Sequence, residues 1–472
     1  MRPRLPSPRS PSPHSRPRMK TMSSEPRSPW STRSATGRAT SARSRRGLAG
    51  RRVLVLLESL ELGGAERQAL LLARYLQEYE DSVVEVWGWG PPGRAADLCH
   101  RLGLPWRSYR LRWHAGRWQR LMDIVALARQ LARWRPDLLL PYCRVPNIVA
   151  GLVWRWTGAA GCIWNQRDTG LDLGASRLEP WAVRSVPAVV ANSTHAAQRL
   201  AALFRLRQPI HVVPNGVRLD PPAASRSEWR RRLGIDQRGL VAVMVANIHR
   251  AKDHATPLRA WHRVVRRLGS QGQEGSAAAE PEGFAAPDRQ PPAPSPKALL
   301  VLAGRLDEPT GPMGLVRELG LQEHVRFLGA VDDVSGLLSA ADLGVFASLA
   351  EGCPNGILEC MAAGLPVVAT VCPGTTEVLG PAGQGMLVPP QDDAALADRL
   401  LLLAHNPTLR RTVGEANRRR VQTEYAWEIM GRTMATLLAG LLDHSAAPPP
   451  HRTVPAPHAW PSLAQSQAPL EP

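Results

Sequence analysis

Lysine is scarce in this sequence, and several features that define other protein classes are missing. Only Lys20, Lys252 and Lys297 occur among the 472 residues, so arginine supplies nearly all of the positive charge. The six cysteines form no CxxC pair, which argues against a disulfide framework or a zinc site. No apolar run reaches the roughly 18 residues of a transmembrane helix, and the start of the chain lacks the apolar stretch of a secretory signal. We therefore expect a cytoplasmic protein with reduced thiols and no metal.

The positive charge is concentrated at the start of the chain. The formal net charge is +19, and residues 1–50 carry twelve Lys and Arg against a single acid, Glu25. This stretch is rich in Pro, Ser and Arg and is expected to be a disordered basic tail, because it lacks the residues of a packed core. An arm for nucleic acid or an anionic surface is the alternative; we do not expect a nucleic-acid partner. We also predict a disordered insertion at 269–297 and a disordered Pro-rich tail at 445–472.

The rest of the chain alternates short apolar runs with segments of helical period. This alternation favours parallel strands in βαβ units, and the Pro-Asn-Gly turn at 214–216 separates two such sets. The expected strands cover 53–57, 83–89, 137–140, 162–165, 189–191, 210–213, 240–246, 299–303, 325–328, 343–347, 366–369 and 385–388. We expect two Rossmann-like domains that bind ligand in a cleft at the carboxyl ends of their strands.

Residues 351–359, EGCPNGILE, carry two carboxylates around a helix start. We expect Glu351 in the loop after a strand, Asn355 as the cap of a helix through Gly356–Ala363, and Glu359 one turn beyond it. The helix N-terminus suits a diphosphate, and a carboxylate can accept hydrogen bonds from two sugar or ribose hydroxyls. The alternative is a capping cluster with a glutamate on the helix surface.

Two further loops are candidates for the same ligand. Lys252 follows the first expected strand of the second domain, where its point charge suits a phosphate; a solvated loop lysine is the alternative. Gly63 and Gly64 lie between the first expected strand and helix, where glycine lets backbone amides approach a phosphate or sugar closely. The pair is not part of a GxGxxG, which disfavours a nicotinamide enzyme, and we expect no cofactor.

Together these segments resemble the retaining glycosyltransferases of family four, which have the GT-B fold. The resemblance rests on GGAER at 63–67, VPNGV at 213–217, VANIHRAKDH from 245, LLVLAGR at 299–305, the 351–359 motif and GMLVPPQDD from 385. It implies an α/β fold of two facing Rossmann-like domains with an interdomain cleft. The domains implied are an acceptor domain at 51–214, a donor domain at 215–424 and a helix within 425–444 that crosses back to the first domain.

The resemblance also implies roles for individual residues. Glu351 would contact the donor sugar, Glu359 the ribose and Lys252 the diphosphate, with Glu351 and Lys252 as the catalytic pair. The remaining donor-binding positions implied are Gly63, Gly64, Asn247, Arg250, Gly352, Asn355 and Gly356. The family acts without a metal.

The sequence departs from the family pattern at two positions. Asn247 stands where the family commonly has an arginine before the lysine, and Arg250 is a candidate replacement. A first-domain histidine near the donor sugar is absent from 141–147 and 164–170, so Asn165, Arg167 or Asp168 are candidates for its role.

The segment 107–120 combines five arginines and two tryptophans with no acid. Such a mixture is typical of a surface that contacts an anionic membrane or a lipid-phosphate acceptor. A solvated basic face with tryptophans packed on the core is the alternative. In the first case the protein would be peripheral on the inner face of the membrane.

These observations predict an enzyme, a retaining hexosyltransferase. We expect it to move a hexose from a nucleoside-diphosphate sugar to a saccharide or lipid-linked saccharide in polysaccharide or glycolipid biosynthesis. A related nucleotide-sugar epimerase is disfavoured by the paired glutamates. The remaining alternative is a GT-B relic that binds nucleotide-sugar or glycan without turnover, because of the departures at Asn247 and at the missing histidine.

Overall fold

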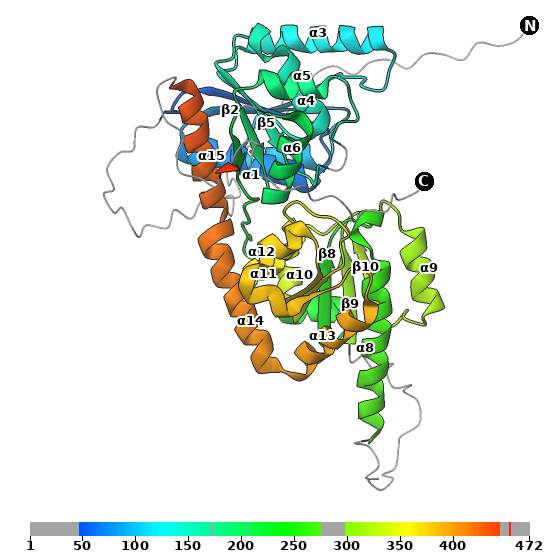
Figure 1. Cartoon of the computed structure of the whole chain (residues 1–472). Helices are drawn as coiled ribbons and strands as arrows, with labels where there is room; N and C mark the ends of the chain where they lie inside the picture. The colour runs from blue at the N-terminus through cyan, green and yellow to red at the C-terminus, as the bar shows by residue number, and fades with distance from the viewer. Residues whose placement is uncertain (1–46, 171–172, 207, 275–297, 444–452, 455–472) are drawn as a thin grey trace, which may run out of the picture. The chain divides into compact units, whose positions relative to one another are not determined.

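The computed structural model describes residues 47–170, 173–206, 208–274, 298–443 and 453–454, and these form two parallel sheets with helices on both faces (Figure 1). The first sheet has the order β14-β7-β6-β5-β4-β1-β2-β3 and the second the order β10-β9-β8-β11-β12-β13. All pairs are parallel except β14 with β7. The α/β class and the two Rossmann-like domains predicted from the sequence are therefore confirmed.

The strands and helices of the first sheet alternate along the chain. The strands are β1 Arg52–Leu57, β2 Val83–Trp89, β3 Trp106–Tyr109, β4 Leu138–Pro141, β5 Gly161–Gln166, β6 Ala188–Ala191, β7 Ile210–Val212 and β14 Thr453–Val454. The helices are α1 Gly64–Tyr79, α2 Arg94–Leu102, α3 Arg117–Trp134, α4 Arg144–Val153, α5 Glu179–Ser185 and α6 Thr194–Phe204, with the 3-10 turn η1 Trp154–Trp156.

The second sheet repeats this pattern. Its strands are β8 Leu240–Val245, β9 Ala298–Ala303, β10 Val325–Gly329, β11 Leu343–Phe346, β12 Val367–Thr370 and β13 Leu387–Val388. Its helices are α7 Arg226–Leu233, α8 Ala255–Glu274, α9 Thr310–Glu318, α10 Val334–Ala340, α11 Asn355–Ala362, α12 Pro373–Gly383, α13 Asp393–His405 and α14 Pro407–Arg420, with the turns η2 Arg250–Lys252 and η3 Gln384–Met386. A π-helical turn, η4 Val421–Tyr425, leads into the last helix, α15 Trp427–Leu442.

The apolar run of β1 explains why its sheet is covered on both faces. Val53, Val55 and Leu57 belong to one core cluster, whereas Leu54 and Leu56 belong to another. Side chains alternate between the faces of a strand, so an uninterrupted apolar run needs a hydrophobic layer on each side. Helix α15 contributes to the first of these layers and packs beside α1, where its Trp427 contacts the ring of Tyr75 edge-on (Figure 1).

The structure corrects the predicted boundaries of the three low-complexity segments. Leu48 is fully buried in the core and its carbonyl accepts a hydrogen bond from Ser82, so the folded part begins before residue 51. Residues 269–274 continue helix α8, whose preceding turns already bury an apolar face that includes Leu258, Trp261 and Val264. Thr453 and Val454 pair with β7, where its edge offers free backbone groups. The other residues of these segments lie outside the described part of the chain.

The sequence prediction also missed β3, because it interpreted 107–120 as one surface segment. Trp106–Tyr109 pairs with β2 at the edge of the sheet, where Arg107 and Ser108 are exposed. A polar edge strand lacks the apolar run on which the other predictions depended.

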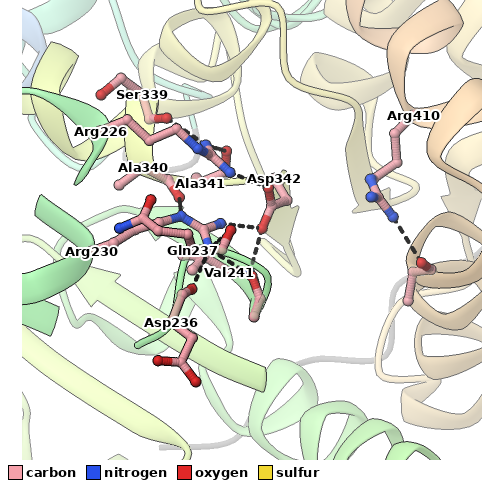
Figure 2. A network of polar contacts seen from close by, with 12 residues as sticks. Arg226, Arg230, Asp236, Gln237, Val241, Ser339, Ala340, Ala341, Asp342 and Arg410 are labelled. Carbon is pink, nitrogen blue, oxygen red and sulfur yellow. Dashed lines mark hydrogen bonds and ion pairs between the residues drawn. The ribbon is translucent and has the colours of Figure 1, made fainter. Parts of the chain in front are cut away.

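One buried cation fixes the beginning of the second domain. Arg230 on α7 has no exposed side-chain area and donates to Oδ2 of Asp342 at 2.7 Å (Figure 2). Its other nitrogens donate to the carbonyls of Asp236, Gln237, Gly239 and Ala340 at 2.8–3.1 Å. This guanidinium therefore joins α7, the chain before β8 and the chain before β11.

Replacing Arg230 with alanine is expected to lower the free energy of unfolding by about 3–5 kcal/mol, because the variant leaves Asp342 and several carbonyls without their buried donor. Urea denaturation measures this change. The matched control is Arg231→Ala on the exposed side of the same helix, which should stay within about 0.5 kcal/mol of the parent. Equal losses in the two variants would contradict the role given to Arg230.

Candidate functional site

Loops from both domains line one cavity of about 400 Å³. Most of the residues selected from the sequence meet there: Gly63, Gly64, Arg167, Asp168, Asn247, Lys252, Glu351, Gly352, Asn355, Gly356 and Glu359. Asn165 and Arg250 do not line it. The cavity lies at the carboxyl ends of the central strands β1 and β8, where parallel sheets of this type bind ligands.

The loop before α1 is held by a side chain from the first turn of α1. Glu66 accepts a hydrogen bond from the backbone N–H of Gly63 at 3.1 Å, which is half of a capping box. A Cβ on Gly64 would lie 2.9 Å from the amide nitrogen of Asn355. Glycine at this position therefore allows the second domain to approach the loop closely.

Lys252 and Glu351 form an ion pair inside the cavity. The Nζ atom of Lys252 donates to Oε1 of Glu351, which also accepts a hydrogen bond from Ser348 at 2.7 Å. The Glu351 side chain is 12% exposed and that of Lys252 is 29% exposed. Each charge is therefore partly withdrawn from water and compensated by the other. An anion that binds Lys252 would release Glu351 to accept hydrogen bonds from other donors.

Glu359 is buried at the far end of the same loop-helix unit. It belongs to α11, is 8% exposed and lines the cavity. Burial raises the pKa of its carboxyl group, whereas the nearby Arg67 acts in the opposite direction. Carboxylates rarely occupy such a position without a partner, so a ligand with hydroxyl donors would satisfy it.

Asn355 lies at the junction of three segments. Its Nδ2 donates to the carbonyl of Gly64 at 3.1 Å, and its Oδ1 accepts from Asn215 at 2.8 Å and from Gln68 at 3.2 Å. The sequence prediction that Asn355 caps the helix is wrong. Pro354 is the cap residue of α11, because the Asn355 side chain turns away toward Gly64, Asn215 and Gln68.

Gln68 also fastens the turn between the domains. It donates to the carbonyl of Gly216 and accepts from the N–H of Gly216, both at 2.9 Å. The sequence analysis did not select Gln68. Its position one helical turn after Gly64 was the available signal.

Arg167 is a buried cation beside the cavity. Its nitrogens donate to Asn165 at 2.8 Å, to the carbonyl of Val213 at 3.0 Å and to Asn215 at 3.3 Å. Its guanidinium lies 5.7 Å from the centre of the Tyr142 ring, and burial lowers its pKa. Within the described residues no carboxylate pairs with it, and its Nη2 has no hydrogen-bond partner. Such a charge favours an anionic ligand in the adjacent cavity.

Asp168 lines the same cavity and accepts from the N–H of Gly170 at 2.6 Å, whereas Asn165 is fully buried and acts through Arg167. The first-domain candidates therefore separate into two cavity residues and one supporting residue.

Arg305 is a cavity cation that the sequence analysis missed. It lies two residues after the end of β9, and its backbone N–H donates to the side chain of Asn247 at 3.1 Å. Arg250, the expected replacement, lies in η2 outside the cavity lining. The position of Arg305 after a strand's carboxyl end was the signal that would have identified it.

Glu377 joins the two domains away from this cavity. Its carboxylate accepts from the N–H and hydroxyl of Thr194, at 3.0 Å and 2.9 Å, at the start of α6. Within the described residues, no group of three or more His, Cys, Asp or Glu side chains could hold a metal ion. The cavity lining offers cations, the three carboxylates of Asp168, Glu351 and Glu359, and the N-terminus of α11.

Two family models match the chain, one over most of the first sheet and the other over the second sheet. The model of Glycosyltransferase Family 4 matches residues 62–221, and that of Glycosyl transferases group 1 matches residues 225–420.

The chain is also similar to curated proteins. It is 26% identical over 354 residues to a GDP-mannose-dependent monoacylated alpha-(1-6)-phosphatidylinositol monomannoside mannosyltransferase of Corynebacterium glutamicum, covering 66% of this chain and 84% of that protein. It is 32% identical over 243 residues to a D-inositol 3-phosphate glycosyltransferase of Salinispora arenicola, covering 48% of each chain. The chain thus spans about half the length of the second relative.

Solved structures share the fold. The Anabaena protein HepE in complex with UDP and glucose superposes with a TM-score of 0.67 at 19% identity, over 83% of this chain and 100% of that one. WaaG, a glycosyltransferase involved in lipopolysaccharide biosynthesis, superposes with a TM-score of 0.62 at 17% identity, over 82% and 100%. At these identities the likeness concerns the fold, and it is the GT-B fold.

The raised pKa of Glu359 predicts that the free energy of unfolding depends on pH. The ordinary pKa of a glutamate is 4.5, and the folded state binds the Glu359 proton more tightly than the unfolded state does. The stabilisation from this bound proton is therefore lost as pH rises through the pKa of the folded state. Glu359→Gln should therefore unfold at higher urea than the parent at about pH 7.5, and the gap should close toward about pH 4.5. Glu415→Gln, on the exposed face of α14, is the control. A gap that stays constant with pH would contradict the account.

Proposed function

Because the chain belongs to the group 1 glycosyltransferases of the GT-B fold, we propose that it moves a hexose from a nucleoside-diphosphate sugar, with retention of configuration, to a saccharide or lipid-linked saccharide. The observation that carries this proposal is the cavity in which Lys252, Glu351 and Glu359 meet the Gly63–Gly64 loop. The named activities of the relatives, on phosphatidylinositol mannoside and inositol phosphate, support an acceptor for glycolipid or polysaccharide biosynthesis.

The ribose, diphosphate and sugar of the donor each match a different charged group of the cavity. Glu359 accepts the two ribose hydroxyls, and Lys252 with the N-terminus of α11 holds the diphosphate. Glu351, released from Lys252, accepts hydrogen bonds from the sugar hydroxyls. Arg305 and Arg167 supply further positive charge from opposite domains, in place of the arginine and histidine that the family commonly has.

The reaction needs a stabilised leaving group. The bond between the sugar's anomeric carbon and the diphosphate oxygen breaks, and the acceptor hydroxyl oxygen forms its bond to that carbon on the same face. The acceptor proton passes to an oxygen of the departing diphosphate. Preorganised cations and helix N–H groups stabilise the negative charge that develops, so neither a metal nor a protein nucleophile is required in this scheme.

Replacing Lys252 with methionine should lower kcat/KM for the donor by about 100-fold or more, because the variant loses a cation at the developing negative charge. Arg305→Ala should lower it by about tenfold or more. Release of nucleoside diphosphate from a panel of UDP- and GDP-sugars measures both effects.

The matched control is Arg250→Ala, which removes a cation from outside the cavity lining. It should leave turnover within about threefold of the parent. If Arg250→Ala is as damaging as Arg305→Ala, the assignment of Arg305 is wrong. Tight binding of a nucleotide-sugar by the parent with no release of nucleoside diphosphate would instead favour the relic that binds without turnover.

The exposed side of α3 supports a peripheral membrane contact as part of this proposal. Trp118 is 68% exposed and Met122 is 65% exposed, and Leu121 lies between them. Two of the five arginines in 107–120 are paired with carboxylates: Arg107 with Glu85, and Arg112 with Asp123. Arg110, Arg117 and Arg120 therefore carry the available charge. No helix in the described ranges is long and apolar enough to cross a membrane.

A comparison of anionic with neutral lipid vesicles should reveal this contact. We expect the protein to sediment with vesicles that contain about 30% anionic lipid. Binding should fall by about 100-fold in an R110Q/R117Q/R120Q variant, because each charge near the surface contributes about 1 kcal/mol. An R129Q/R133Q variant further along α3 is the comparison. Equal binding to neutral vesicles, or unchanged binding of the triple variant, would remove this part of the proposal.

A further inference from the structure

A second pocket of about 420 Å³ lies within the first domain. It is lined by Glu58, Trp89, Leu111, Arg112, Trp113, His114, Ala115 and Val145. Glu58 directly follows β1, Trp89 ends β2, and 111–115 follow β3. The pocket thus opens at the carboxyl ends of three neighbouring parallel strands, the edge at which such sheets bind ligands, and its size falls within the range of small-molecule sites.

Two indole rings give this pocket its apolar walls. The ring of Trp89 is held by an edge-on contact with Tyr109, at 5.9 Å between centroids. The ring of Trp113 is held by Arg120, whose guanidinium lies 5.2 Å from the ring centre. Both tryptophans remain partly exposed although each packs against the core. Rings that are fixed at one side and open at another provide flat faces for the C–H groups of a sugar ring.

The charges at the pocket favour a ligand rich in hydroxyls over an anion. Arg112 is engaged by Asp123 through two side-chain hydrogen bonds, at 3.0 Å and 2.9 Å, so its charge is already compensated. Glu58 is half-buried in the lining, which it shares with Val145. A half-buried carboxylate repels phosphate and accepts hydrogen bonds from hydroxyl groups.

Glu58 also connects this pocket with the donor cavity. Its pKa is raised by burial first and then by the negative charges of Glu66 and Asp168. Glu66 holds the Gly63 loop, and Asp168 lines the donor cavity. The loop after β1 contributes Glu58 to this pocket and Leu62 and Gly63 to the donor cavity, so one short segment borders both.

We propose that the pocket of Glu58, Trp89 and Trp113 binds the accepting sugar as a neutral pyranose, with its ring on an indole face and a hydroxyl donating to Glu58. This assignment rests on the proposed transfer reaction, because it places an acceptor beside the donor cavity. Helix α3 begins two residues after Ala115. A lipid attached to the sugar would leave the pocket on the side that carries Trp118.

Saturation-transfer NMR with octyl α-mannopyranoside and octyl α-glucopyranoside tests the pocket on the full chain. The parent should transfer saturation to the pyranose ring protons of at least one probe. Trp113→Ala should weaken its binding by about tenfold, since the indole supplies much of the apolar contact. Glu58→Gln should weaken it less and should retain the ring contact. Trp156→Ala is the matched control, because Trp156 is 72% exposed in the same domain and outside the pocket lining.

Nucleoside-diphosphate binding by calorimetry accompanies each variant. Retained UDP or GDP affinity in Trp113→Ala shows that the variant is folded and that the donor cavity is intact. The pocket assignment is overturned if neither pyranoside binds the parent, if Trp113→Ala and Trp156→Ala lose equal signal, or if inorganic phosphate displaces the pyranoside. If the parent itself binds neither UDP nor GDP, the proposed function is overturned, whatever the pyranoside result.

Discussion

The side-chain amide of Asn355 joins the parts on which the donor cavity depends. It donates to the Gly64 loop of the first domain and accepts from Asn215 in the connecting turn and from Gln68 on α1. The same residue is the first of α11, the helix whose N-terminus faces the cavity and which carries Glu359. The approach of α11 to the glycine loop is therefore fixed by one planar side-chain group. This arrangement requires glycine at position 64, because a Cβ there would collide with the side-chain amide of Asn355.

In the ligand-free cavity some charges are paired with each other and others are buried with little compensation. Lys252 and Glu351 compensate each other, so a donor must exchange this pair for its own contacts, and the exchange favours ligands that have both an anionic and a hydroxyl-rich part. Arg167 and Glu359 are buried, and burial shifts the pKa of each toward its neutral form, as expected for charges that are compensated only in part. Binding groups that cost folding free energy are common at functional sites. A nucleoside-diphosphate sugar satisfies both kinds of group at once.

Much of the fold could be predicted because the apolar runs are continuous. Val83–Trp89 agrees with the expected strand to the residue, because an apolar run defines a buried strand. The final helix, Trp427–Leu442, lies within the range 425–444 that the family resemblance implies. Trp106–Tyr109 could not be found this way, since an edge strand with exposed residues carries little periodic signal. Leu48 was assigned to the tail because a single apolar residue in a basic stretch gives no pattern.

Residues of the cavity lining could be selected from the sequence where they follow strands, whereas contacts that span the chain could not. Lys252 and Glu351 are both loop residues after strands, and the structure brings them together. Asn355 was given to its own helix, whereas its partners lie up to 291 residues away. Arg305 was passed over in favour of Arg250, because distance in sequence says little about which cation faces a cavity.

The measurement that tests the central claim most directly is calorimetric binding of UDP and GDP to the parent and to Glu359→Gln. The account predicts that one nucleoside diphosphate binds the parent and binds the variant about tenfold or more weakly, since two hydrogen bonds to a carboxylate are lost. Absence of binding to the parent, or equal affinity in the two proteins, would contradict it.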